Sequence, residues 1–135
     1  MKRLIIVAVL IALAASLAAA IGSRASASKV GVLAGVWEAT DMGDASNVTM
    51  WLTQDGGHYD LLLYDNLASY YCDPDAPANG LGEARFRGNV LSLTVEFWCL
   101  SASPTYGGSL EWSVTYDPAT DTMVDPLDGQ TWHRR

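Results

Sequence analysis

The stretch that most constrains the fold is residues 88–99, where the turn signal Gly88-Asn89 precedes a run of strict alternation. Apolar side chains fall on one face of this run: Leu91, Leu93, Val95, Phe97 and Cys99. Polar side chains fall on the other face: Ser92, Thr94 and Glu96. A period of two is typical of a half-buried antiparallel strand, and such a strand needs neighbours to pair with. The rest of the chain is therefore expected to supply further strands.

The same alternation recurs along the chain after residue 34. Further strands are predicted at residues 35–40, 47–54, 58–65, 83–87, 110–116, 122–125 and 130–134. Short stretches rich in Gly, Asp and Asn separate most of them, as expected of tight turns. Residues 66–82 break the pattern and are predicted to be a loop, because Pro74 and Pro77 cannot donate to a strand ladder. Seven or eight strands in this order predict an all-β, antiparallel up-and-down meander, either closed as a barrel or flattened as a sandwich.

Residues 1–27 have the composition of a signal peptide, with a signal helix expected ahead of the strands. Lys2 and Arg3 precede an apolar stretch, and Ala25-Ser26-Ala27 provides the small residues that a signal peptidase reads. Cleavage is therefore expected before Ser28, which leaves residues 28–135 as a single secreted or periplasmic domain with no membrane attachment. The alternative is an uncleaved membrane anchor over residues 4–22, whose length approaches the ~20 residues needed to span a bilayer.

The predicted domain is strongly acidic. It keeps five of the eight Lys and Arg residues and all 15 Asp and Glu residues, and five cations set against 15 carboxylates leave a formal charge of −10. Nucleic acid is not expected as a partner, because phosphate binding needs a basic face. An anionic membrane surface is disfavoured for the same reason. An acidic surface that keeps an exported protein soluble explains the charge most simply, and it says nothing about oligomeric state.

Cys72 and Cys99 are the chain's two cysteines, and in an exported chain they are expected to form a disulfide. Closing this loop would stabilise a small domain by roughly 3.5 kcal/mol in the loop-entropy model. The alternatives, a metal pair or a redox thiol, are disfavoured because the chain has no C-x-x-C spacing and no histidine near either cysteine.

Gly35-Val36-Trp37, at the start of the first predicted strand, is similar to the G-x-W signature of lipocalin-like (calycin) barrels. Trp132-His133-Arg134 resembles the segment whose basic residue closes such barrels over that tryptophan. The resemblance implies an antiparallel barrel with an apolar cavity at one mouth, and carriage of a small hydrophobic ligand. It also implies structural roles for Trp37, Trp132 and Arg134. The chain departs from the family in lacking the T-D-Y motif and the long C-terminal helix, and in its short length.

No catalytic motif stands out in the chain. His58 and Asp60 lie two apart on one strand face, but the sequence shows no third metal ligand, and an exposed polar face accounts for both. No serine lies in a G-x-S-x-G context. The aspartates concentrate in predicted turns, which they stabilise, although clustered carboxylates also suit calcium. The sequence therefore predicts a protein that is not an enzyme and has no metal and no cofactor.

Aromatic residues are numerous for this length, with five Trp and six Tyr. Five are predicted to contact a small apolar molecule or a glycan: Trp51, Tyr64, Tyr70, Tyr71 and Trp98. The favoured function is therefore a small-ligand or carbohydrate-binding module. The alternative is an extracellular structural or protein-interaction domain without a ligand cavity, and an enzyme is the least favoured. An apolar pocket of roughly a few hundred cubic ångströms would separate the first two.

Overall fold

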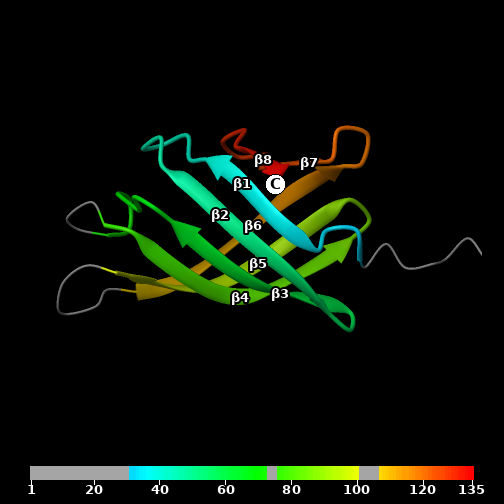
Figure 1. Cartoon of the computed structure of the whole chain (residues 1–135), viewed down its shortest axis with the longest axis horizontal. Helices are drawn as coiled ribbons and strands as arrows, with labels where there is room; N and C mark the ends of the chain where they lie inside the picture. Colours follow the sequence, from blue (N-terminus) through cyan, green and yellow to red (C-terminus); the bar gives the residue numbers. More distant parts are fainter. Residues whose placement is uncertain (1–30, 73–75, 101–106) are drawn as a thin grey trace, which may run out of the picture.

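The computed structural model describes residues 31–72, 76–100 and 107–135, which form eight antiparallel strands. The strands are β1 (Gly35–Thr40), β2 (Asn47–Asp55), β3 (His58–Asp65), β4 (Ala78–Arg87), β5 (Val90–Cys99), β6 (Gly107–Asp117), β7 (Thr122–Val124) and β8 (Thr131–Arg134). Each strand pairs with the next, and β8 pairs with β1, so the sheet closes into a barrel (Figure 1). The predicted all-β meander is confirmed, in its barrel form. The predicted signal peptide, residues 1–27, and the first residues of the predicted domain lie outside the described residues.

None of the described residues belongs to a helix long and apolar enough to cross a membrane.

Alternation along the strands produces the core, as the sequence predicts. On β5, Leu91, Leu93 and Val95 are at most 1% exposed, while the residues between them face outward. On β2, Met50 and Leu52 are buried with them in one cluster inside the barrel. Burial of a side chain of this size stabilises the fold by about 1.5–3 kcal/mol, so this cluster is the main driving force for folding.

One predicted boundary is wrong, because β4 begins at Ala78 and not at residue 83. Gly80 and Gly82 hide this part of the strand, since glycine usually signals a turn. In the structure these glycines allow a close approach of β4 to β5. A Cβ at Gly82 would overlap the carbonyl oxygen of Thr94, and a Cβ at Gly80 would overlap the side chain of Val95. Glycine here serves backbone packing and not a turn.

The first predicted boundary of β6 is also late, because this strand begins at Gly107 and not at Leu110. A Cβ at Gly107 would contact the carbonyl oxygen of Phe97 at 2.5 Å. The reason is therefore the same as in β4, with a glycine at a close approach to β5.

The two ends of the barrel differ. The tight β2–β3, β4–β5 and β6–β7 turns gather at one end, on the right of Figure 1, together with residues 31–34. We call this the closed end. The β1–β2 and β7–β8 turns lie at the other end, together with the described residues between β3 and β4, the end of β5 and the start of β6. We call this the open end. An up-and-down barrel places successive turns at opposite ends. The turns of the closed end and those of the open end can therefore serve different purposes.

The disulfide between Cys72 and Cys99 is present, which confirms the predicted pair. The two Cα atoms are 5.6 Å apart, a usual separation for a disulfide. Both cysteines belong to a small second core with Ala68, Ala76 and Ala78. This bond ties the β3–β4 connection to the end of β5, at the open end of the barrel. It therefore holds the lip of that end in place.

We expect the double variant Cys72→Ala/Cys99→Ala to be less stable by about 3.5 kcal/mol, because the unfolded chain regains the entropy that the closed loop removes. Urea unfolding of the oxidised protein and of the double variant measures the difference. The wild type after reduction should unfold at the midpoint of the double variant. Equal midpoints for the oxidised protein and the double variant would show that the disulfide adds no stability.

Candidate functional site

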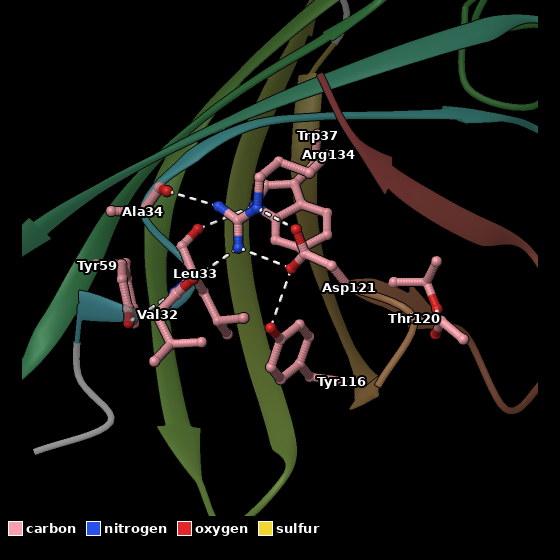
Figure 2. Close-up of polar contacts among 10 residues, drawn as sticks. Val32, Leu33, Ala34, Trp37, Tyr59, Tyr116, Thr120, Asp121 and Arg134 are labelled. Atoms are coloured by element: carbon pink, nitrogen blue, oxygen red, sulfur yellow. Dashed lines mark hydrogen bonds and ion pairs between the residues drawn. The ribbon is translucent and has the colours of Figure 1, made fainter. Parts of the chain in front are cut away.

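The closed end is built around Arg134, the last residue of β8. Its guanidinium lies over the Trp37 ring, with Cζ 4.3 Å from the ring centroid. Two of its nitrogens donate to backbone carbonyls, Nη1 to Ala34 at 2.8 Å and Nη2 to Val32 at 2.6 Å. Trp37 in turn donates from Nε1 to the carbonyl of Leu33 at 2.9 Å. Arg134 and Trp37 thus hold residues 32–34 across this end of the barrel, as Figure 2 shows.

Asp121 completes this group from the β6–β7 turn. Its carboxylate accepts two hydrogen bonds from Arg134, from Nε at 2.7 Å and from Nη2 at 3.0 Å. The Tyr116 hydroxyl donates to the same carboxylate at 3.0 Å. Asp121 has a left-handed backbone, with φ of 51°, a conformation that aspartate tolerates better than most residues. We call Trp37, Tyr116, Asp121 and Arg134 the closed-end cluster.

The charges in the closed-end cluster stabilise each other. The hydrogen bond from Arg134 lowers the pKa of Asp121 more than burial raises it. The same hydrogen bond raises the pKa of Arg134. Burial, followed by the hydrogen bond to Asp121, raises the pKa of Tyr116. Each of these polar groups has a partner within the protein, and together they join β1, β8 and the β6–β7 turn.

A cavity of about 310 Å³ lies at the open end. Apolar side chains form most of its walls: Val48, Leu63, Phe97, Leu110, Trp112 and Trp132. Its position reflects the uneven pairing of β6, which pairs with β5 over most of its length but with β7 only from Thr115 to Asp117. Beside the first half of β6 the cavity therefore extends to the β7–β8 turn. The volume is at the lower end of the range of small-molecule sites.

Carboxylates surround the cavity. Asp41 and Asp65 continue the inward-facing alternation of β1 and β3 past the apolar residues, and Asp125, which is 7% exposed, comes from the β7–β8 turn. Burial raises the pKa of Asp65, and the nearby charges of Asp44 and Asp41 raise it further, although a hydrogen bond from the Leu67 N–H opposes them. The open end therefore holds like charges near one another.

Short turns position these acids. Each of six aspartates accepts a hydrogen bond from the backbone N–H two residues later: Asp41, Asp44, Asp65, Asp117, Asp125 and Asp128. The prediction that aspartates stabilise the turns is confirmed. Asp44 also accepts from the Ser69 N–H, which connects the β1–β2 turn to the β3–β4 connection. Burial alone would raise the pKa of Asp44, but the hydrogen bonds from Ser46 and Ser69 together outweigh it and lower that pKa.

The structure brings one of the five predicted ligand contacts to the cavity. Tyr71 lines it and packs against Phe97, with ring centroids 5.1 Å apart, next to the disulfide. Tyr70 lies beside it and is 71% exposed. Trp51, Tyr64 and Trp98 alternate with buried residues on their strands, so their side chains lie on the outer face of the barrel.

The acids of the cavity were not among the predicted site residues. The sequence does indicate them, because Asp41 lies two residues after the inward-facing Ala39, and Asp65 lies two residues after the inward-facing Leu63. A carboxylate at an inward position of a strand is unusual unless it has a partner or a function. The sequence alone does not show that these two strand ends lie at the same end of the barrel. That follows from how the strands pair.

Asp55 is a third side chain of a metal-ligating type beside His58 and Asp60 at the closed end. Asp55, across the β2–β3 turn, brings its Oδ2 to 3.8 Å from His58 Nε2, and Asp60 Oδ1 lies 3.7 Å from the same nitrogen. The three ligand atoms lie within 4.8 Å of one another. Both carboxylates are more than 60% exposed, and three ligands are one fewer than a structural zinc site uses.

No protein-family model matches this chain, and neither a curated protein nor a solved structure matches it.

The raised pKa of Asp65 predicts how stability depends on pH. Its folded pKa lies above the unfolded value, so its favourable contribution is complete below the unfolded pKa and is lost as the pH rises through the folded pKa. Asp65→Asn should therefore be more stable than the wild type at pH 7, and this advantage should shrink at pH 3, where the wild-type carboxyl is protonated. Urea unfolding at both pH values measures it.

Asp117→Asn is the matched control, because Asp117 forms a turn of the same geometry at the closed end, away from the cavity. Asp117→Asn removes a carboxylate from a turn only, whereas Asp65→Asn also removes a charge from the cavity. The comparison therefore isolates the effect of the cavity charge. An Asp65→Asn variant that is less stable than the wild type at pH 7, with the deficit gone at pH 3, would contradict the predicted sign.

Proposed function

We propose that this protein is a small exported lipocalin-like binding protein that takes up a small molecule with an apolar body at its open end. One observation carries the proposal, namely a cavity of about 310 Å³ with mostly apolar walls at one mouth of a closed eight-stranded barrel. The arrangement of Trp37 and Arg134 at the opposite end supports the lipocalin-like assignment, because this is the contact that the G-x-W resemblance implies. The proposed role is binding and not catalysis.

Export by a signal peptide cleaved before Ser28 is part of the proposal. The Cys72–Cys99 disulfide is consistent with an extracellular or periplasmic location, because disulfides persist in oxidising compartments. The acidic surface disfavours nucleic acid and anionic membranes as partners.

Binding of N-phenyl-1-naphthylamine, a neutral apolar dye whose fluorescence rises in an apolar site, tests the proposal. We expect saturable binding to the wild type. Leu110→Trp places a larger side chain in the cavity wall and should weaken binding at least tenfold, because it removes the space that the dye occupies.

Leu81→Trp is the matched control for this experiment. It makes the same exchange on the outer face of β4, where Leu81 is 52% exposed, and should leave binding unchanged. Absence of dye binding to the wild type, or equal binding to the two variants, would contradict a ligand cavity at the open end.

The outer face supports a second candidate function, a protein-interaction domain. Trp51, Leu62 and Leu81 occupy paired positions on β2, β3 and β4, so they form a row across the outside of the barrel. Leu62 and Leu81 are 41% and 52% exposed. Contiguous exposed apolar side chains are typical of contact surfaces. A protein of this second kind would fail to bind the dye in the cavity.

A further inference from the structure

The charged residues that border the open-end cavity all have the same sign. They are Asp41, Asp65, Asp125, Asp128 and Glu111, and Glu111 directs its side chain to the outer face of β6. Among the lining residues that the structure describes, there is no Lys, Arg or His. Arg134 and Arg135 do not offset this charge, because each is paired with a different carboxylate, Asp121 or Glu38. Apolar walls of low dielectric strengthen the field of these acids inside the cavity.

Two of these carboxylates are held where water cannot fully solvate them. Asp125 is 7% exposed, and Asp65 is partly buried at an inward position of β3. The neighbouring charges of Asp41 and Asp44 add to the cost of ionising Asp65. A carboxylate whose surroundings disfavour its ionised form, as those of Asp65 do, commonly marks a functional site, because a ligand of opposite charge relieves the cost of ionisation on binding.

We propose that the ligand is an amphiphilic organic amine. Its apolar body lies against Leu63, Leu110 and Trp112, and its protonated amine pairs with Asp65. A fatty acid or another carboxylate is excluded by this arrangement, because its charge would meet only like charges. This inference rests on the proposed function and adds the chemical class of the ligand.

Isothermal titration calorimetry of the purified protein with three matched probes tests which ligand charge the cavity prefers. The probes are 4-methoxyphenethylamine, 2-(4-methoxyphenyl)ethanol and 4-methoxyphenylacetate, which share one body and differ in charge. We expect the amine to bind at least roughly tenfold more tightly than the alcohol, as a charged hydrogen bond provides. The acetate should give no binding.

The outcomes separate this inference from the proposed function. If the alcohol or the acetate binds as tightly as the amine, the amine class is wrong and the cavity remains a ligand site. If none of the three binds while the neutral naphthylamine dye does, the amine class is again overturned. If the dye also fails to bind, the proposed function fails.

Two variants assign the contacts. Asp65→Asn should weaken amine binding roughly tenfold and leave alcohol binding unchanged, a difference that a merely structural effect would not produce. Glu83→Gln is the control, because Glu83 is an exposed acid on the outer face of β4. Equal loss for amine and alcohol in Asp65→Asn, or equal loss in Glu83→Gln, would overturn the amine contact.

Discussion

The contact between Arg134 and the start of the barrel is the interaction on which the rest of the structure depends. β8 and β1 are joined by two residue pairs, Trp37 with Arg134 and Glu38 with His133, and by a backbone hydrogen bond from the Arg135 N–H to the Val36 carbonyl at 2.9 Å. So short a ladder is weak by itself. Arg134 adds a ring contact with Trp37, two hydrogen bonds to the carbonyls of residues 32 and 34, and two to Asp121. One planar, five-donor side chain thereby connects β8, β1 and the β6–β7 turn.

Closure of the barrel at the Trp37 end leaves the open end as the side at which the cavity lies. The tight turns and the closed-end cluster close the end that contains Trp37, and the cavity lies at the opposite end. There, the Cys72–Cys99 disulfide joins the residues before β4 to the end of β5, and Tyr71 packs on Phe97 beside it. Under the proposed function, a cavity wall that is already held in place lowers the entropic cost of binding.

Most of the fold follows from alternation in the sequence, and the misplaced starts of β4 and β6 have one cause. Gly80, Gly82 and Gly107 lie at close approaches to β5, which composition alone does not show. The site was less predictable. Trp51, Tyr64 and Trp98 could be assigned to a strand face, but only the pairing of strands shows that this face is the outside of the barrel, and that Asp65 and Asp125 share one mouth.

The free energy of unfolding of Arg134→Met, measured by urea titration beside Arg135→Met, tests the role of the closed-end cluster most directly. Arg135 is a matched control, because its ion pair with Glu38 is exposed and lies on the next residue. We predict a loss of about 2–3 kcal/mol for Arg134→Met, from its charged hydrogen bonds and ring contact, and of at most about 1 kcal/mol for Arg135→Met. Equal losses for the two variants would contradict the claim that Arg134 holds the barrel closed.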